Sequence, residues 1–316
     1  MTRMEHVRFC MLCGMGKLMS LGGFAGTRFL GKCLGGLIWH FIPERRRLAA
    51  ENIASHLDLS AAEAKAVAHA SFLNTGQSFL ELLLTQRFGF DFPRLAVEPP
   101  ELLEKLRSCQ RPVVAATAHF GAWELLAPLL GQLYQDRPRL VVVRRYDDNA
   151  AQAFIERQRQ ATGAKMIGHR LAAMTVLRAL HKNGIAAFLV DHNTKPEEAL
   201  FIPFLKEKAA VNAGPALLAV RARALVWPVV LSRRGKDYVF RLQPPLDTAE
   251  LEGSIDDKIR QTAVFYTRAI ENFVKSEPEQ WFWMHNRWKT RPQLDASTAA
   301  SAANAKKTPG TTGGSA

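Results

Sequence analysis

Short apolar segments that alternate with helical segments constrain the fold of this chain most strongly. From residue 112 onward, apolar runs suited to buried strands are separated by stretches with a helical spacing of apolar residues. The predicted strands cover residues 112–120, 139–145, 185–191 and 225–232, and the predicted helices cover residues 122–135, 150–161, 171–182 and 213–223. Strands that alternate with helices predict an α/β fold, in which a central, mostly parallel sheet is flanked by helices.

Further elements are predicted on either side of this alternating region. Ser60 and Glu63 have the spacing of a capping box, so we expect helices over residues 60–87. Residues 237–246 predict an edge strand, and residues 255–276 predict a final helix.

The two ends of the chain differ from this middle part. Residues 10–42 are apolar and rich in glycine, whereas residues 295–316 are small and polar without apolar periodicity. We therefore expect a membrane-anchoring helix within residues 1–42, the main globular domain over residues 43–294 and a disordered tail over residues 295–316.

The type of membrane contact follows from the charges in the N-terminal segment. Lys17, Arg28 and Lys32 interrupt it before any run reaches the about 18 to 20 uncharged residues of a membrane span. On one helix these cations would lie within roughly 60° of one another, opposite a broad apolar surface. This pattern predicts a helix that lies in the interface and stops near Pro43, ahead of the basic run 45–47; the alternative is a buried amphipathic helix of the core.

Composition limits the partners of the chain. Its 42 Lys and Arg residues against 29 Asp and Glu residues give a net charge of +13, which favours an anionic partner: membrane lipid, nucleic acid or an acidic carrier protein. Four cysteines form no disulfide framework for 316 residues. Cys10 and Cys13 lack a second pair at zinc-ligand spacing, so we expect no metal.

The stretch AATAHFGAWELLAPLL places a His and a Glu five residues apart beside a strand. On one continuous helix His119 and Glu124 would lie about 140° apart, too far to meet. With His119 at the end of the strand, Gly121 in a turn and Glu124 in the first helical turn, carboxylate and imidazole can meet. Such a pair makes a general base. The alternative is a buried structural His with a surface Glu.

Several segments together resemble one enzyme family. The His-x-x-x-x-Glu motif is followed by VVVRRYDDNAAQAFIERQRQATG, FLVDHNTKPEEALFIPFLKEKAAVNAGPALLAV and PEQWFWMHNRWKTRP. Together with PERRRLAAENI and the N-terminal apolar segment, these residues resemble the late acyltransferases of lipid A biosynthesis, a family that also includes relatives acylating other glycolipids. The resemblance runs from about residue 10 to residue 292. It implies a glycerolipid acyltransferase-like fold.

The resemblance also implies roles for particular residues. His119 would be the general base on an acceptor hydroxyl, and Glu124 would orient it. Arg145, rather than Arg144, would bind acceptor phosphate or the thioester oxyanion. Asp191, at the end of the predicted strand 185–191, matches the family's acidic position and is an implied substrate-binding residue. The chain departs from the family there, because His192 follows Asp191 where Asp-Gln is usual. The remaining implied substrate-binding residues are Asn149, Phe201, Pro203 and Phe204, the last three being equally compatible with ordinary core.

The implied reaction moves a fatty acyl chain from an acyl thioester, with acyl carrier protein favoured over coenzyme A, to a hydroxyl of a lipid A precursor. It requires no cofactor, and it would take place on an anionic membrane surface at the cytoplasmic face of the cell inner membrane. The sequence has neither the Gly-x-Ser-x-Gly elbow of serine hydrolases nor a phosphate-binding loop. Another glycolipid or phospholipid acceptor is one alternative. A non-enzymatic basic binder is the other, although no nucleic-acid-binding signature is found.

Overall fold

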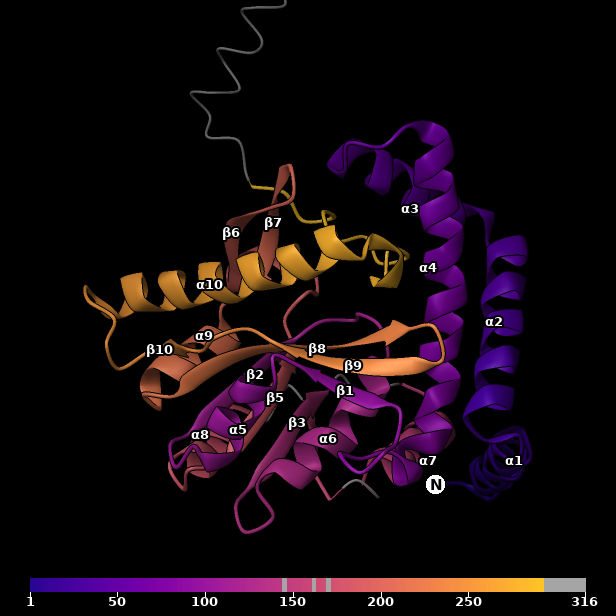
Figure 1. Cartoon of the computed structure of the whole chain (residues 1–316), viewed down its shortest axis with the longest axis horizontal. Helices are drawn as coiled ribbons and strands as arrows, with labels where there is room; N and C mark the ends of the chain where they lie inside the picture. Colours follow the sequence, from indigo (N-terminus) through magenta and orange to yellow (C-terminus); the bar gives the residue numbers. More distant parts are fainter. Residues whose placement is uncertain (144–146, 161–162, 169–171, 293–316) are drawn as a thin grey trace, which may run out of the picture.

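A computed structural model describes residues 1–143, 147–160, 163–168 and 172–292. Its centre is an eight-stranded sheet with the order β1-β9-β8-β2-β5-β3-β4, in which β10 also pairs with β8 (Figure 1). The strands are β1 (Leu95–Glu98), β2 (Val113–Thr117), β3 (Arg139–Val143), β4 (Lys165–Gly168), β5 (Ile185–Leu189), β8 (Leu225–Arg234), β9 (Asp237–Leu242) and β10 (Leu246–Asp247). The predicted strands are confirmed, and β1, β4 and β10 are additional.

The predicted parallel arrangement holds for the middle of the sheet. β2 pairs in parallel with β5 and β8, and β3 pairs in parallel with β4 and β5. The hairpin of β8 and β9 is antiparallel, and β1 runs parallel to β9 at the edge. Because β2 and β5 are parallel neighbours, the residues that follow them emerge side by side at one edge of the sheet.

Helices cover both faces of the sheet, because the central strands bury side chains on both sides. Along β2, Val114 and Ala116 belong to one apolar cluster, whereas Val113 and Ala115 belong to the other. The first cluster is covered by α4 (Ala61–Glu81), α8 (Ala172–Leu180), α9 (Gly214–Arg221) and α10 (Ile255–Ser276). The second is covered by α5 (Pro100–Ser108) and α6 (Leu126–Leu133). The mostly parallel sheet flanked by helices is thus confirmed.

The long helix α4 connects the sheet to the N-terminal helices. It begins with the predicted capping box of Ser60 and Glu63 and continues as a three-ten helix, η1 (Leu82–Arg87). On its outer side lies α2 (Gly23–Phe41), which approaches so closely that a Cβ at Gly35 or Gly76 would overlap the facing backbone. α2 is therefore packed against the main domain by direct backbone contact.

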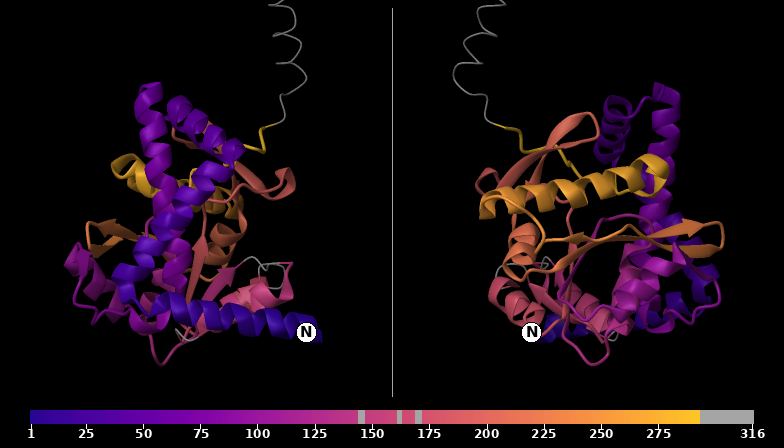
Figure 2. Two further views of the ribbon diagram at one scale, coloured as in Figure 1. Left: turned by 90° about the vertical axis from the view of Figure 1, so that its right-hand side faces the viewer. Right: turned by 60° about the vertical axis from the view of Figure 1, so that its left-hand side comes forward.

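The N-terminal segment forms two helices rather than the single helix expected. α1 (Arg3–Ser20) and α2 meet at a bend of 114°, and α1 packs against α7 (Asn149–Gln160) and η1 (Figure 2). Within the described residues no single helix is long and apolar enough to cross a membrane, but the bent pair together meets these criteria by length and composition.

The bend also changes the expected arrangement of cations. Lys17 lies on α1, whereas Arg28 and Lys32 lie on α2, so the three do not share one helical face. Arg28 points inward: its guanidinium donates to Gln77 Oε1 at 3.2 Å and to the Gly235 carbonyl at 2.7 Å. The expectation that Arg28 shares one helical face with Lys17 and Lys32 is therefore wrong, because the chain bends between the two helices and Arg28 binds Gln77 and the Gly235 carbonyl.

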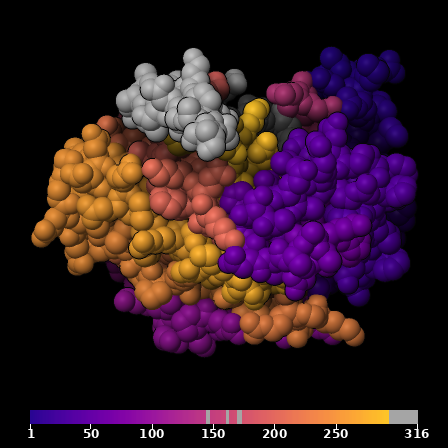
Figure 3. All heavy atoms as spheres, turned by 90° about the horizontal axis from the view of Figure 1, so that it is seen from above, coloured from indigo at the N-terminus to yellow at the C-terminus, as the bar shows by residue number. Residues whose placement is uncertain are grey.

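The chain beyond α2 contains two further elements that sequence reasoning missed. The expected helix end near Pro43 is present, since α2 ends at Phe41. Pro43 also begins a further helix, α3 (Pro43–His56), because proline is tolerated in the first turn of a helix. Near the other end, β6 (Ala199–Phe204) and β7 (Glu207–Asn212) form a separate antiparallel hairpin. Viewed from above, α3 lies beside this hairpin (Figure 3), and Lys206 forms an ion pair with Asp58 at 2.6 Å.

Candidate active site

The loop after β2 carries His119 and is held by backbone hydrogen bonds on both sides. Gly121 N–H donates to the Gln280 carbonyl at 2.8 Å, and the His119 carbonyl accepts from Phe282 N–H at 3.0 Å. Gly121 has a φ of +56°, and a Cβ there would overlap the Leu231 carbonyl oxygen. The predicted order of strand, His119, glycine turn and helical turn is confirmed, with the turn formed by the three-ten helix η2 (Trp123–Leu125).

Asp191 meets His119 at the carboxyl ends of the two parallel strands. One carboxylate oxygen, Oδ1, lies 3.0 Å from His119 Nδ1, and the other, Oδ2, accepts from the His119 backbone N–H at 2.9 Å. Trp281 Nε1 also donates to Oδ2 at 2.9 Å. The Asp191 side chain is only 3% exposed and that of His119 is 19% exposed, so solvent reaches the imidazole but hardly the carboxylate.

The electrostatics of this pair favour an ionised carboxylate. Burial alone would raise the pKa of Asp191, but the nearby charge of His119 and its hydrogen bond outweigh burial and bring the pKa well below the usual value. An ionised carboxylate accepts hydrogen bonds only, which fixes a proton on His119 Nδ1. The Nε2 nitrogen of His119 then carries the lone pair that a general base needs.

Glu124 lies near the loop but binds a different partner. Arg159 donates to it twice, from Nε to Oε2 at 3.0 Å and from Nη2 to Oε1 at 2.7 Å, and Trp123 Nε1 donates to Oε1 at 3.3 Å. Among the hydrogen bonds of the described residues, none joins Glu124 to His119. The predicted contact between these two is therefore replaced by His119–Asp191 and Glu124–Arg159, because α7 brings a guanidinium to the η2 carboxylate.

The other predicted site residues lie in several places. Arg145 and Arg144 fall outside the described residues. Asn149 is exposed at the start of α7 and donates to Glu5 Oε1 at 2.9 Å, on the side of α1. Phe201, Pro203 and Phe204 lie on β6, where Phe204 is buried and its ring centroid lies 5.4 Å from that of Trp281. Phe204 thus packs against Trp281, which in turn donates to Asp191.

The C-terminal segment provides support that sequence reasoning did not assign. Trp281 binds Asp191, Arg287 donates to the His192 carbonyl at 2.9 Å, and the Asn193 N–H donates to His285 Nε2 at 3.0 Å. Burial lowers the pKa of Arg287 to about 10 and that of His285 to about 4. The motif QWFWMHNRWKTRP therefore packs around residues 191–193; the aromatic and basic composition of the motif was the available signal.

A buried network of charged and polar side chains on α4 and β8 supports the loop that carries His119. Arg233 forms an ion pair with Glu81, and its Nη2 donates to Ser78 Oγ at 2.8 Å. Ser78 Oγ in turn donates to the Gly121 carbonyl at 2.6 Å. The side chains of Glu81 and Arg233 are 0% and 5% exposed, so both charges depend on this network for their compensation. It connects α4 and β8 rigidly to the turn beside His119.

Similarity to known proteins extends along nearly the whole chain. Residues 3–290 match the family of bacterial lipid A biosynthesis acyltransferases. The chain is 27% identical over 273 residues to the lipid A biosynthesis lauroyltransferase of Escherichia coli (strain K12), covering 84% of this chain and 85% of that protein. It is 26% identical over 278 residues to the lipid A biosynthesis palmitoleoyltransferase of the same organism, covering 85% and 87%.

The chain is also similar, over a shorter stretch and at lower identity, to a third relative. The lipid A biosynthesis acyltransferase of Haemophilus influenzae is 22% identical over 184 residues, covering 57% of this chain and 56% of that protein. The match to the family covers nearly all described elements, from α1 to the segment that contains Trp281. The chain is therefore an acyltransferase and belongs to the bacterial lipid A biosynthesis acyltransferase family.

Proposed function

We propose that this chain transfers a fatty acyl group from acyl carrier protein to a hydroxyl group of a lipid A precursor. The observation that carries the proposal is the 3.0 Å contact between His119 Nδ1 and Asp191, which prepares a general base in a member of this family. Relatives named lauroyltransferase and palmitoleoyltransferase support the acceptor class and a fatty acyl donor. The net charge of +13 supports an acidic donor protein.

In the proposed reaction, His119 Nε2 removes the proton of the acceptor hydroxyl while its oxygen attacks the thioester carbonyl carbon. The carbon–sulfur bond then breaks, and the proton on His119 passes to the leaving thiolate, so no proton is gained or lost overall. A thioester is already activated, which makes an enzyme nucleophile unnecessary. General-base catalysis of this kind contributes roughly 10² to 10⁴ in rate.

In this proposal the two carboxylates have different tasks. Asp191 holds the His119 ring in one tautomer and stabilises the imidazolium that forms during transfer. Glu124 accepts two hydrogen bonds from Arg159, whose side chain is only 13% exposed, so the two opposite charges compensate each other away from bulk solvent. The Glu124–Arg159 pair thus holds η2 against α7 beside the loop that carries His119. Arg145 remains a proposed ligand of acceptor phosphate or of the oxyanion.

We also propose that α1 and α2 hold the enzyme on the cytoplasmic face of the inner membrane. Twelve of the fifteen large apolar side chains that are exposed in the described part of the chain lie within residues 1–42. Examples are Met11, Leu18 and Phe29, which are 61%, 68% and 66% exposed. Apolar surface on this scale gains about 25 cal/mol for each Å² removed from water.

Lipid analysis tests the proposed reaction. Lipids from cells that lack this protein are compared by mass spectrometry with lipids from cells that produce either the wild type or His119→Ala. We expect the wild type to restore one acyl group on a lipid A species and His119→Ala not to restore it. Restoration of acyl groups on another glycolipid or phospholipid would contradict the acceptor, and full restoration by His119→Ala would contradict the mechanism.

Point substitutions test the membrane contact better than truncation, because removal of α2 would also expose α4. The triple variant Met11→Ser, Leu18→Ser, Phe29→Ser is compared with the control Met174→Ser, Ile255→Ser, whose residues are 60% and 62% exposed elsewhere. In liposome flotation we expect the triple variant to be released and the control to stay bound, even at high salt. Equal binding of both variants would place the membrane contact elsewhere.

A further inference from the structure

A second His beside the proposed base has no part in the reaction described above. His192 follows Asp191, and its ring centroid lies 4.5 Å from that of His119, with the two rings nearly perpendicular at 87°. One possible ligand atom from each of His119, Asp191 and His192 lies within 4.8 Å of the other two. Two imidazoles and a carboxylate so close together form a donor set for a metal ion.

The hydrogen bond of His192 determines which nitrogen can bind an ion. Its Nδ1 lies 3.2 Å from the Leu189 carbonyl oxygen, which can only accept, so the proton lies on Nδ1 and the lone pair on Nε2. A ligand His normally donates its other N–H to a backbone carbonyl or a carboxylate in this way. The Arg287 hydrogen bond to the His192 carbonyl further fixes the backbone that carries the ring.

We propose that His119, Asp191 and His192 bind a divalent transition-metal ion of the Zn²⁺ type, and that this ion inhibits the enzyme. Two nitrogens and one carboxylate oxygen match the three protein ligands of open zinc sites, with a fourth position left for water. Mg²⁺ and Ca²⁺ prefer oxygen ligands and are not expected to bind. A carboxylate oxygen has two lone pairs, so Asp191 can contribute one to the ion.

Binding of the ion to either nitrogen of His119 would inhibit the enzyme. If Nε2 binds, the lone pair that would accept the hydroxyl proton is occupied. If Nδ1 binds, the hydrogen bond from Nδ1 to Asp191 is lost, and with it the orientation of the ring. This consequence rests on the proposed function, whereas binding of the ion itself depends only on the three side chains.

His285 provides a matched control because it is a partly buried neighbour outside the donor set. Its ring centroid lies 6.0 Å from that of His192, but its Nε2 already accepts from the Asn193 N–H. The N-terminal cysteines require a second precaution, since Cys10 Sγ lies 3.7 Å from His6 Nε2 on α1 and both can bind metals. All measurements therefore use the full chain with Cys10→Ser and Cys13→Ser.

Metal binding is measured first, without any assay of acyl transfer. The detergent-solubilised protein is titrated with Co²⁺, and its visible d–d absorption is followed, with Zn²⁺ added afterwards as competitor. We expect an absorption that saturates at one ion per chain and that Zn²⁺ abolishes. His192→Gln should weaken binding at least about tenfold, whereas His285→Gln should not. Absence of the absorption, or equal affinity of His192→Gln and the parent, would overturn the proposed site.

Acyl transfer is then measured with and without Zn²⁺, each variant being compared with its own metal-free rate. We expect Zn²⁺ to inhibit the parent and His285→Gln, EDTA to reverse this, and His192→Gln to resist. Mg²⁺ at the same concentration should have no effect. Activation by Zn²⁺ would overturn the inhibitory role. Metal binding in a chain that transfers no acyl group would instead contradict the proposed function and leave the metal site standing.

Discussion

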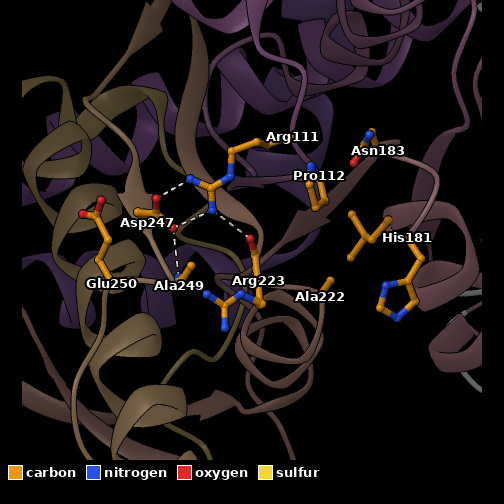
Figure 4. Close-up of a pocket in the computed structure, with 10 residues that line it drawn as sticks. Arg111, Pro112, His181, Asn183, Ala222, Arg223, Asp247, Ala249 and Glu250 are labelled. Carbon is orange, nitrogen blue, oxygen red and sulfur yellow. Dashed lines mark hydrogen bonds and ion pairs between the residues drawn. The ribbon is translucent and has the colours of Figure 1, made fainter.

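The central sheet carries one hydrogen-bonded carboxylate at the carboxyl ends of its strands and another at their amino ends, and the two carboxylates have different partners. At the carboxyl ends of the strands Asp191 accepts from His119, and at the amino ends Asp247 accepts from Arg111 Nη2 at 2.7 Å. Pro112 and His119 are seven residues apart on β2 and its extension, which separates the two ends by roughly 20 Å. At the amino ends lies an open cavity of about 590 Å³, lined by Arg111, Pro112, His181, Arg223, Asp247 and Glu250 among others (Figure 4).

Both carboxyl groups have a lowered pKa, but only one of them can take part in proton transfer. The hydrogen bond from Arg111 lowers the pKa of Asp247, and Asp247 raises the pKa of Arg111 still further. An arginine keeps its proton at any pH that the protein meets, whereas a histidine gives it up near neutral pH. The cavity of about 590 Å³ therefore lies at the end of the sheet opposite His119, and the titratable partner of Asp191 distinguishes the candidate active site.

The largest effect is expected for His119→Ala. Loss of the general base should lower kcat by about 10² to 10⁴ without loss of the fold. His181→Ala, at the other end of the sheet, is the matched control and should retain the wild-type rate. The measurement is acyl transfer to a detergent-dispersed acceptor, with circular dichroism to check folding. A wild-type rate for His119→Ala, or an equal loss for His181→Ala, would remove the distinction between the two ends.

Asp191→Asn should have the next largest effect, a loss of about 10² in kcat. Three donors converge on this side chain: the His119 backbone N–H, His119 Nδ1 and Trp281 Nε1. An amide replaces one acceptor oxygen with a donor NH₂, so at least one donor would face another donor whichever way it is turned. We expect KM for the thioester to change far less than kcat. A change confined to KM would mean that Asp191 contributes to binding rather than to orientation of the base.

Glu124→Gln is expected to cost about tenfold in activity, and a double-mutant cycle with Arg159→Gln shows why. If the two residues act as a pair, the double variant should be no worse than either single variant, because it removes both charges, whereas each single variant removes one charge and leaves the opposite one. Unfolding by urea gives the corresponding stability cycle. A loss as large as that of His119→Ala for Glu124→Gln alone, with Arg159→Gln nearly normal, would restore the predicted direct action of Glu124 on His119.

The contrast between Asp191 and Glu124 also shows what the sequence could predict. Local patterns predicted β2, β5, β8 and the placement of His119 at the end of a strand, because apolar runs and glycine turns are local features. The partner of His119 could not be predicted in this way, since it depends on β5 being the neighbour of β2 in the sheet. Glu124, five residues away in sequence, was expected instead of Asp191, which is 72 residues away.

Elements without a strong local pattern were missed for related reasons. The short strands β1 and β4 have only four residues each, too few for a clear alternation of apolar and polar residues. The hairpin of β6 and β7 contains Pro203, which lowers the strand propensity of its segment, and its phenylalanines were assigned to the substrate site. The inward position of Arg28 depended on Gln77 and Gly235, far away in the chain.

The smallest effect is expected at the amino ends of the strands, for Asp247→Asn. Its partner Arg111 is 41% exposed, so solvent screens the pair and the variant should lose only about 0.5 to 1 kcal/mol of unfolding free energy at pH 7. Because the folded-state pKa of Asp247 is lowered, this contribution is present above the unfolded pKa of about 3.9 and is lost as the pH falls through the folded value. Wild type and variant should therefore converge in stability at acidic pH.

We measure the stability of Asp247→Asn by urea unfolding at pH 7 and at successively lower pH. Its activity is measured by acyl-transfer assays at pH 7. A stability difference that persists after the carboxyl group is protonated would assign the contribution to packing rather than to charge. Activity should equal that of the wild type, because Asp247 and Arg111 pair with each other at the end of the sheet opposite His119. A rate as low as that of Asp191→Asn would mean that the two ends are coupled through β2, and the proton-transfer criterion that separates them would fail.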